Sequence, residues 1–465
     1  MGRLFGTDGV RGLANGEILT ASLALDLSVC AAKVLLAHDN TAGRRASGRP
    51  LAVLDDGAPR PRPLALAGRD TRASGEFLQA AVASGLASAG VDVLDLGVIP
   101  TPGIAYLTDV MGADVGVVIT ASHNPMRDNG VKFMQRGGIK LDDALEDEIQ
   151  ALLGLPKELP TGGDVGRISV HPTAATQYVE YLVSTVTKPL AGLTVVVDCS
   201  QGASSVTGPM ALENAGATVI PIFNTPNGLD INDGCGATHT EALQKAVVEH
   251  GADCGFAFDG DADRCIGVDA HGSVVDGDQL IALMAVALKE RGALAGDTVV
   301  VTVMSNLGFA RAMAEHGITV RRTAVGDRYV AEDMRDGGFS LGGEQSGHII
   351  FSEYSTTGDG TLTALQVLQR MAETGKSLAE LASVMTRFPQ VLVNVPDVDK
   401  SRTDDPVLRE AVLAEQAALG DAGRLLLRPS GTENLVRVMV EAESETRARV
   451  AADRLADVVR ERLSL

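Results

Sequence analysis

The sequence predicts an α/β protein with three related α/β domains, whose sheets are mixed or mainly parallel, and a C-terminal α+β domain. Two observations lead to this fold class: a strand–turn–helix–strand unit occurs three times, and the pattern changes after Phe388. In addition, each repeated unit is followed by a polar loop after another apolar strand. Because ligands bind at the carboxyl ends of strands in such sheets, we expect these loops to surround a central cleft.

Each repeated unit contains an apolar strand that ends in a polar or glycine-containing turn, a helix-like run that ends in Gly, and a second short strand. The first strands with their turns are residues 64–75, 193–202 and 298–308. The helix ends with the second strands are residues 86–93, 212–219 and 313–320. This order is typical of βαβ units, which imply parallel strands with helices on both faces.

The first two units also share the residues that lead into their polar loops. Residues 112–116 read Gly-Ala-Asp-Val-Gly, and residues 251–255 read Gly-Ala-Asp-Cys-Gly. The same offset aligns Ser122 with Asp261. We therefore expect the Ser122 and Asp261 loops to occupy equivalent positions in two related sheets.

The C-terminal residues predict a small α+β domain of different topology. Its expected elements are a strand at 391–395, a helix at 405–419, strands at 423–428 and 435–441, and a helix at 444–463. Residues 39–63 hold four prolines and five arginines, and we interpret them as an exposed loop inserted in the first domain. The predicted domains are residues 1–170, 171–270, 271–387 and 388–465.

The composition limits the classes of partner that the protein can bind. The chain has 465 residues and a formal net charge of −20, which argues against nucleic acid and anionic membranes. Five cysteines without a CxxC pair indicate free thiols in a reducing compartment. The N-terminus does not resemble a signal peptide, and the apolar runs are short for a membrane span. We therefore expect a cytoplasmic protein.

The stretch that organises the chain is the predicted strand end at 117–120 and the polar turn after it, from Ala121 to Pro125. A serine at the tip of such a turn, Ser122, is expected to be exposed and held by a rigid scaffold. That placement suits a nucleophile or a phosphate carrier. The alternative is an ordinary strand exit, because serine is a common turn residue.

A second polar loop predicts a metal site. Asp259, Asp261 and Asp263 alternate after the apolar residues 256–258, and alternation in an extended loop would turn their carboxylates to one side. Three adjacent carboxylates require a cation, and a hard divalent metal prefers such oxygen donors. An EF-hand is excluded, because its Gly and Glu positions hold Arg264 and Ala270.

Two further loops carry groups that suit a sugar phosphate. Residues 428–432 (Arg-Pro-Ser-Gly-Thr) offer a guanidinium, two hydroxyls and backbone amides to a phosphate, although a plain β-turn has the same composition. Glu344, Ser346 and His348 alternate, so they could face one side and bind sugar hydroxyls. His348 is either a general base or phosphate donor, or a structural histidine.

Together these loops resemble the four signature loops of the α-D-phosphohexomutase superfamily. They read Thr-Ala-Ser-His-Asn-Pro at 120–125, Asp-Gly-Asp-Ala-Asp-Arg at 259–264, Gly-Glu-Gln-Ser-Gly-His at 343–348 and Arg-Pro-Ser-Gly-Thr-Glu at 428–433. Residues 5–12, residues 325–329 and the Glu-Gln-Ser form of the third loop look most like the bacterial phosphoglucosamine mutase branch. One departure is Asn434, where the family often has Pro.

The resemblance implies an isomerase that interconverts glucosamine 6-phosphate and glucosamine 1-phosphate, and so feeds UDP-N-acetylglucosamine and peptidoglycan synthesis. It implies phosphorylated Ser122, an activating hexosamine 1,6-bisphosphate, and Mg²⁺ bound by the Ser122 phosphate and the three aspartates. Lys132 and His348 match positions proposed for proton transfer, and Arg264 would neutralise the transferred group. The four domains would carry, in order, the phosphoserine, the metal, the sugar and the substrate's phosphate.

The implied partner is a small sugar phosphate, and a homodimer is left open. The residues implied in substrate binding are Thr7, Arg11, His123, Asp327, Arg328, Glu344, Ser346, Arg428, Ser430, Gly431, Thr432 and Arg437.

Three alternatives stay open at this point. A phosphomannomutase/phosphoglucomutase would differ mainly in the sugar loop at 344–346. A phosphatase of the haloacid-dehalogenase type would use Asp259 as the nucleophile in place of Ser122. A non-catalytic sugar-phosphate sensor would have little use for the intact serine, aspartates and histidine.

Overall fold

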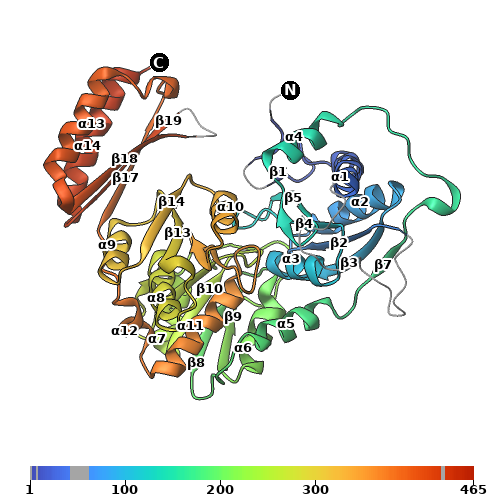
Figure 1. Ribbon diagram of the computed structural model, residues 1–465, viewed down its shortest axis with the longest axis horizontal. Helices are drawn as coiled ribbons and strands as arrows, with labels where there is room; N and C mark the ends of the chain where they lie inside the picture. Colours follow the sequence, from blue (N-terminus) through green and yellow to red (C-terminus); the bar gives the residue numbers. More distant parts are fainter. Residues whose placement is uncertain (1–2, 7–8, 42–61, 431–434) are drawn as a thin grey trace. The chain divides into compact units, whose positions relative to one another are not determined.

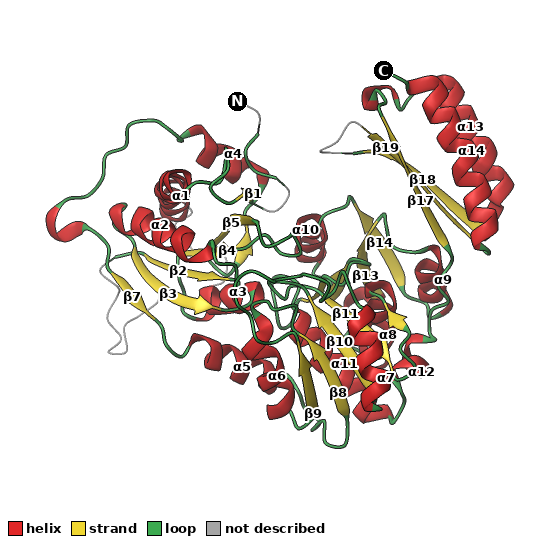
Figure 2. Ribbon diagram, turned by 180° about the vertical axis from the view of Figure 1, so that it is seen from behind, coloured by secondary structure: helices red, strands yellow, loops and turns green. Residues whose placement is uncertain are grey.

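The computed structural model describes residues 3–6, 9–41, 62–430 and 435–465. The predicted insertion at 39–63 lies almost entirely outside these residues, as do the predicted site residues Thr7, Gly431 and Thr432. The chain divides into two compact units. The larger consists of Met1–Val303 and Thr319–Ala382, and the smaller of Met304–Ile318 and Ser383–Leu465 (Figures 1 and 2).

The first sheet of the larger unit has seven strands in the order β1-β5-β4-β2-β3-β7, with β6 paired to β5. The strands are β1 (Val10–Leu13), β2 (Leu64–Arg69), β3 (Asp92–Val98), β4 (Val115–Ile119), β5 (Asp128–Gln135), β6 (Ile139–Lys140) and β7 (Ile168–Val170). Strands β2, β3, β4 and β7 pair in parallel, whereas β1, β5 and β6 pair antiparallel. The sheet is therefore mixed, within the predicted fold class.

Helices cover both faces of this sheet. They are α1 (Ala21–Thr41), α2 (Gly75–Ser88), α3 (Thr101–Val110) and α4 (Asp143–Ala151). On β2, Ala65 and Ala67 belong to the core that α1 and α2 share. The next residue, Gly68, faces the other way, because a side chain there would meet Ile104 of α3. This alternation buries the strand on both sides.

Two further mixed sheets complete the larger unit, in the orders β12-β11-β10-β8-β9 and β14-β13-β15-β16. Their strands are β8 (Thr194–Asp198), β9 (Thr218–Ile222), β10 (Cys254–Phe258), β11 (Cys265–Asp269), β12 (Val274–Val275), β13 (Thr298–Thr302), β14 (Thr319–Thr323), β15 (Leu341–Gly343) and β16 (Ile349–Phe351). The accompanying helices are α5 (Ala174–Ser184), α6 (Ser204–Asn214), α7 (Glu241–His250), α8 (Gly277–Glu290), α10 (Asp327–Gly337), α11 (Gly360–Thr374) and α12 (Leu378–Ala382).

The predicted repeat is confirmed three times, as β2-α2-β3, β8-α6-β9 and β13-α9-β14, where α9 is Leu307–Glu315. The two strands of each repeat pair in parallel. The glycines that follow the helices, Gly90, Gly216 and Gly317, have φ values of 88°, 104° and 64°. Only Gly enters this region without strain, so it ends each helix and turns the chain toward the next strand.

The predicted equivalence of the Ser122 and Asp261 loops is also confirmed. Strands β4 and β10 are separated in the sequence by the same number of residues as the two similar segments, 112–116 and 251–255. Each pairs in parallel with the first strand of its repeat and antiparallel with the strand that comes after its loop. The two loops therefore leave the same end of two related sheets.

The smaller unit contains the predicted α+β domain. Its strands β17 (Gln390–Pro396), β18 (Gly423–Pro429) and β19 (Leu435–Ala442) form an antiparallel sheet in the order β17-β19-β18. The helices α13 (Pro406–Leu419) and α14 (Glu445–Leu463) contribute Leu408 and Leu455 to its core, together with Val438 of the central strand.

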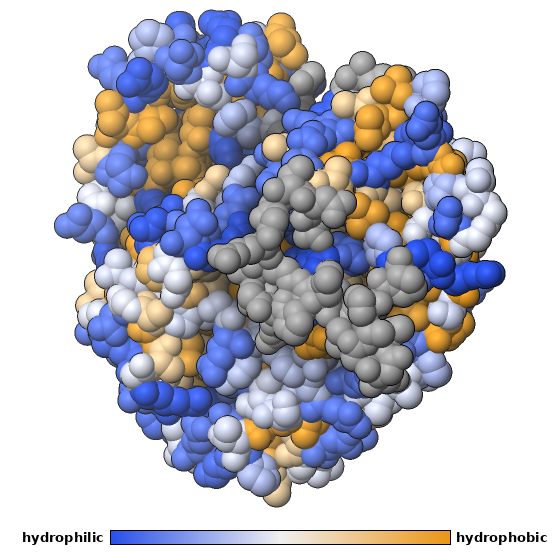
Figure 3. All heavy atoms as spheres, turned by 45° about the vertical axis from the view of Figure 1, so that its right-hand side comes forward, coloured by the Kyte–Doolittle hydropathy of each residue, from blue (hydrophilic) through white to orange (hydrophobic). Residues whose placement is uncertain are grey.

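By length and composition, α1 could cross a membrane, although the apolar runs of the sequence did not suggest it. Half of its apolar window, residues 21–38, is buried. Ala24, Leu27 and Cys30 lie in the core that α1 shares with α2, so α1 has the contacts of a core helix. All five cysteines are buried and free, as predicted. On the face drawn in Figure 3, hydrophilic and apolar residues are interspersed.

Glu441 joins three segments of the smaller unit. Its fully buried carboxylate accepts two hydrogen bonds from Arg424, at 3.0 and 3.1 Å. It also accepts the backbone N–H of Leu307 at 2.9 Å, at the start of α9. The carboxylate therefore connects neighbouring strands β18 and β19 to the segment that precedes them in the chain.

Replacing Glu441 with Ala should lower the local free energy of unfolding by about 3 kcal/mol, because it leaves a partly buried guanidinium uncompensated. The matched control is Glu443→Ala, which removes an exposed pair with Arg447 (62% and 42% exposed) and should cost less than about 1 kcal/mol. Hydrogen exchange of the β17–β19 amides in the whole chain measures both values. Equal protection in the two variants would contradict this role for Glu441.

Candidate active site

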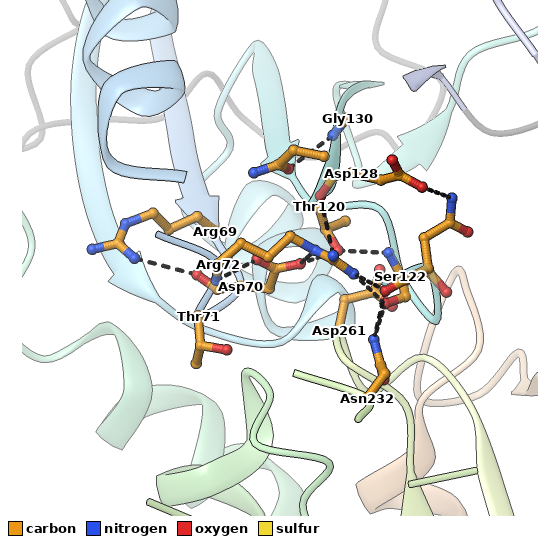
Figure 4. A network of polar contacts seen from close by, with 12 residues as sticks. Arg69, Asp70, Thr71, Arg72, Thr120, Ser122, Asp128, Gly130, Asn232 and Asp261 are labelled. Carbon is orange, nitrogen blue, oxygen red and sulfur yellow. Dashed lines mark hydrogen bonds and ion pairs between the residues drawn. The ribbon is translucent and has the colours of Figure 1, made fainter. Parts of the chain in front are cut away.

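Ser122 lies in the turn after β4, with its backbone in the left-handed region at a φ of 51°. Its amide donates to Thr120 Oγ1 at 2.8 Å (Figure 4). Its Oγ donates to Asp259 Oδ2 at 2.6 Å. The expectation of an exposed serine was wrong, because only 1% of Ser122 is exposed. The turn packs against the Asp259 loop: a side chain at Gly260 would come within 2.6 Å of Ser122 O.

Asp259, Asp261 and Asp263 lie between β10 and β11 and are all at least 97% buried. One carboxylate oxygen from each lies within 4.8 Å of the other two. The predicted convergence is confirmed, but its predicted cause was wrong. The loop is a tight turn, with Ala262 at a φ of 57°, rather than an extended segment with alternating side chains.

The donor set of this loop fits a hard divalent cation. Asp261 Oδ1 and Asp263 Oδ1 are buried and have no hydrogen-bond partner among the described residues. Buried carboxylate oxygens seldom lack a partner, since desolvation without a compensating contact is costly. Mg²⁺ takes oxygen ligands of this kind, usually with waters and phosphate oxygens completing its shell.

Two of the three carboxyls have pKa values that are shifted in opposite directions in the protein without a cation. Burial, together with the charges of Asp263 and Asp261, raises the pKa of Asp259 to about 8. Burial acts in the same direction on Asp263, but His348, Lys132 and Arg264 outweigh it and lower the pKa of that carboxyl. Positive charge bound among these carboxylates would therefore be stabilised.

Two cations and a hydroxyl lie around the acidic loop. Lys132 of β5 is 4% exposed, and its Nζ lies 3.2 Å from Asp261 Oδ2. The same oxygen accepts Thr101 Oγ1 at 2.7 Å. Arg264 Nε lies 4.0 Å from Asp259 and 3.9 Å from Asp263. The structure thus brings Lys132 and Arg264 to the Ser122 and aspartate loops.

His123 is the residue after Ser122 and stays neutral at neutral pH. Its Nδ1 lies 3.2 Å from Ser122 Oγ. Burial, reinforced by the charges of Arg264 and Arg11, lowers the pKa of His123 to about 4. Arg11 lies on β1 opposite Gly130 of β5. The cations on this side of Ser122 are therefore guanidinium groups rather than the imidazole.

His348 points into the interior and is 2% exposed. The backbone N–H of Gly358 donates to its Nε2 at 2.9 Å, so a neutral ring carries its proton on Nδ1, which lies 3.5 Å from Asp263 Oδ2. Burial disfavours the charged ring, but Asp327 and Asp263 outweigh this and raise the pKa of His348. Its part in proton transfer stays a prediction.

The expectation that His348 shares one side with Glu344 and Ser346 was wrong, because residues 345–347 form a turn. Ser346 is exposed and its Oγ donates to Glu344 Oε2 at 3.5 Å, whereas His348 is buried. Glu344 Oε1 also accepts the amide of Gly326 at 3.2 Å. The two polar side chains at the tip therefore form the accessible part of this loop.

Asp327 and Arg328, at the start of α10, have partners within the larger unit. Asp327 forms an ion pair with Lys140 of β6. Arg328 is 5% exposed and binds Asp143 and Glu146 of α4, at 2.8 and 3.3 Å. These contacts orient the start of α10, and substrate binding by Asp327 and Arg328 stays a prediction.

The smaller unit places two guanidinium groups opposite each other. Arg428 of β18 and Arg437 of β19 are cross-strand neighbours. Burial and the charge of Arg437 lower the pKa of Arg428. Ser430 is buried at the strand end, and its carbonyl accepts Lys400 Nζ at 3.0 Å. Adjacent like charges on one face favour an anionic ligand between them.

Three polar residues around Ser122 were not predicted from the sequence. Asp70 and Arg72 come after β2 at the carboxyl end of the first repeated strand, which was a usable signal. Asn232 lies in a loop without regular structure and gave no such signal. All three contact the Ser122 turn or its supporting hydrogen bonds (Figure 4).

The chain matches four domains of one family. They are described as phosphoglucomutase/phosphomannomutase alpha/beta/alpha domains I, II and III, at residues 55–157, 176–272 and 276–388, and its C-terminal domain, at residues 370–458. The domain bounds that we expected from the sequence stay predictions.

A phosphoglucosamine mutase from Nocardioides sp. is 61% identical over 100% of both chains, and others are 55–59% identical over 99–100% of this chain. A phosphoglucomutase/phosphomannomutase family protein from Burkholderia thailandensis has the same fold, with a TM-score of 0.79, 24% identity and coverage of 100% and 99%. Aspergillus fumigatus N-acetylphosphoglucosamine mutase, solved with GlcNAc-6P and magnesium, has a TM-score of 0.62 at 20% identity, covering 82% and 93%.

The four domain matches and the full-length relatives agree. The chain therefore belongs to the phosphoglucomutase/phosphomannomutase family, and within it to the phosphoglucosamine mutases, which are isomerases.

Proposed function

We propose that the enzyme interconverts glucosamine 6-phosphate and glucosamine 1-phosphate through a phosphoserine at Ser122 and a bound glucosamine 1,6-bisphosphate. The name shared by its full-length relatives supports this substrate. A hexosamine 1,6-bisphosphate would prime Ser122. The product would feed UDP-N-acetylglucosamine and peptidoglycan synthesis in the cytoplasm.

The observation that carries the proposal is the contact between Ser122 and the acidic loop. Ser122 Oγ lies 2.6 Å from Asp259 Oδ2, in a site where two buried carboxylate oxygens have no hydrogen-bond partner among the described residues. A metal held by Asp259, Asp261 and Asp263 would neutralise phosphate oxygens on Ser122. Phosphoryl transfer depends mainly on such positioning and charge stabilisation.

The side chains around the acidic loop could bind the transferred phosphoryl group and move the proton of the reacting hydroxyl. Arg264, within 4.0 Å of Asp259 and Asp263, would bind equatorial oxygens of the transferred group. Lys132, whose Nζ lies 3.2 Å from Asp261, would give a proton to the reacting oxygen as the ammonium or take one from the reacting hydroxyl as the neutral amine. Neutral His123 and the charged Arg11 would hold the phosphate on its other side.

The remaining steps concern the sugar. Glu344 and Ser346 would bind hydroxyls of the hexose, and Arg428, Ser430 and Arg437 would bind the phosphate that is not reacting. The bisphosphate must turn over between the two transfers, so a cleft that retains it and excludes water would prevent hydrolysis. This cleft and a homodimer remain predictions.

The alternative nucleophile is Asp259, as in an aspartyl phosphatase. The contacts of this residue favour Ser122 instead. Asp259 Oδ1 accepts the amide of Arg264 at 3.2 Å, and Oδ2 accepts Ser122 Oγ, so both oxygens are engaged. A carboxylate with that bonding is suited to bind a metal and to accept the serine proton.

Acid-quenched enzyme that has been incubated with glucose 1,6-bisphosphate should carry one phosphate on the peptide that contains Ser122. Both phosphates survive a brief acid quench, but hydroxylamine cleaves an aspartyl phosphate and leaves a serine phosphoester intact. Peptide mass spectrometry with and without hydroxylamine separates the two. A hydroxylamine-sensitive label on the Asp259 peptide, with none on Ser122, would overturn the proposal.

Replacing Glu344 with Gln should lower kcat/KM for glucosamine 6-phosphate by about tenfold more than for glucose 6-phosphate. The carboxylate favours the 2-ammonium of glucosamine, and a charged hydrogen bond contributes about 1.5–3 kcal/mol. Gln345→Glu, which adds a charge at the next position, is the control for net charge. Equal losses of kcat/KM for both sugars would show that Glu344 does not recognise the 2-amino group.

A further inference from the structure

Arg72 is buried completely beneath the Ser122 turn, with 0% of its side chain exposed. Its Nε donates to Asp70 Oδ2 at 2.9 Å, and Asp70 Oδ1 accepts the amide of Arg72 at 3.0 Å. Thr120 Oγ1, which receives the Ser122 amide, donates to the same Asp70 Oδ2 at 2.7 Å. The ion pair between Asp70 and Arg72 is thus connected, through the hydroxyl of Thr120, to the backbone N–H of Ser122.

The remaining N–H groups of Arg72 all donate to carbonyls of the segment that contains the turn. Its Nη2 donates to Ser122 O at 2.9 Å and to Asn124 O at 2.8 Å. Its Nη1 donates to the carbonyls of Pro125 and Asp128. All five N–H groups of the guanidinium therefore have partners, and four of the partners are backbone carbonyls.

Asn232 reaches the same two carbonyls from a different part of the chain. Its Nδ2 donates to Ser122 O at 2.9 Å and to Asn124 O at 3.1 Å, and the residue is 7% exposed. The backbone N–H of Asn232 donates to Ser200 O at 3.0 Å. Asp198, at the end of β8, accepts the amides of Ser200 and Gly236 at 2.8 Å each, which fixes the loop that presents Asn232.

We propose that Arg72 and Asn232 are positioning residues for phosphoryl transfer by Ser122, a step that rests on the proposed function above. Each of two carbonyls, Ser122 O and Asn124 O, receives one N–H from each side chain (Figure 4). Neither side chain bonds the Ser122 hydroxyl. They hold the backbone of the turn in its left-handed conformation, and so aim Oγ at the acidic loop.

The arrangement also sets the spacing between two sheets. Arg72 comes after β2 of the seven-stranded sheet, whereas Asn232 lies in the loop that follows β9 of the five-stranded sheet, from which the aspartate loop also extends. A side chain at Gly260 would meet both Ser122 O and Asn232 Nδ2, at 2.6 and 2.9 Å. The serine and the aspartate loops therefore share one fixed contact, with Asn232 as the bridge.

The test compares Asn232→Ala and Asn232→Asp with Asn227→Ala in the whole enzyme. Asn227 is an exposed asparagine of the same loop, and its side chain accepts only a local amide, that of Leu229. Asn232→Asp keeps the shape of the side chain but replaces its donor with an acceptor. The readouts are kcat and KM for glucosamine 6-phosphate, and the rate at which glucose 1,6-bisphosphate phosphorylates the enzyme.

Both Asn232 variants should lose about 10- to 100-fold in kcat and in the rate of phosphorylation, with KM changed less than about threefold, because a displaced nucleophile lowers rate rather than binding. Asn227→Ala should match the wild type. Arg72→Lys keeps the charge but loses the planar set of N–H donors. If it folds, it should also show a lower kcat and a lower rate of phosphorylation with little change in KM. The Asn232 variants test the proposal even if Arg72→Lys does not fold.

Three results would overturn the inference. Folded Asn232→Ala enzyme that is phosphorylated at the wild-type rate would contradict it and leave the proposed function intact. A rise in KM at unchanged kcat would assign Asn232 to substrate binding instead. Wild-type enzyme that never carries phosphate on Ser122 would contradict the proposed function, and the inference with it.

Discussion

The site depends on the electrostatic cost of holding three carboxylates together out of water. Asp259, Asp261 and Asp263 are almost fully buried, with oxygens within 4.8 Å of one another. Two unit charges about 4 Å apart repel by roughly 4 kcal/mol at an effective dielectric constant near 20. Lys132 and Arg264 offset part of this repulsion, and burial together with the neighbouring carboxylates raises the pKa of Asp259. A divalent cation would offset the rest, and would also offset the negative charge of a phosphate on Ser122.

Two sheets whose central strands are arranged in the same way, β5-β4-β2-β3 and β11-β10-β8-β9, supply the serine and the aspartates. Ser122 leaves the seven-stranded sheet after β4, and the aspartates leave the five-stranded sheet after β10, at equivalent positions. Strand ends alone would leave both loops mobile. Arg72 and Asn232 restrict the Ser122 turn through hydrogen bonds to the same two carbonyls, and Gly260 of the aspartate loop packs against Ser122 and Asn232. Buried contacts therefore position the nucleophile next to the acids.

Local patterns in the sequence were sufficient to predict the elements of the fold. Apolar runs ending in polar turns located β4 and β10, and repeated glycines located the helix ends, so the three α/β units and the C-terminal domain could be predicted. Side-chain directions within the loops could not. The structure buries Ser122 because the aspartate loop packs against its turn, and it buries His348 because residues 345–347 form a turn instead of alternating. Asn232 contacts Ser122 only because two distant loops pack together, and no local pattern encodes that contact.

The most direct test of the account is whether the phosphate on Ser122 and the aspartate cluster form one site. Phosphorus NMR of the phosphorylated enzyme, titrated with paramagnetic Mn²⁺ in place of Mg²⁺, measures their proximity. We predict that less than one equivalent of Mn²⁺ broadens the phosphoserine resonance in the wild type, and that Asp261→Asn requires far more metal. A phosphoserine signal that stays sharp at saturating Mn²⁺ would contradict the account.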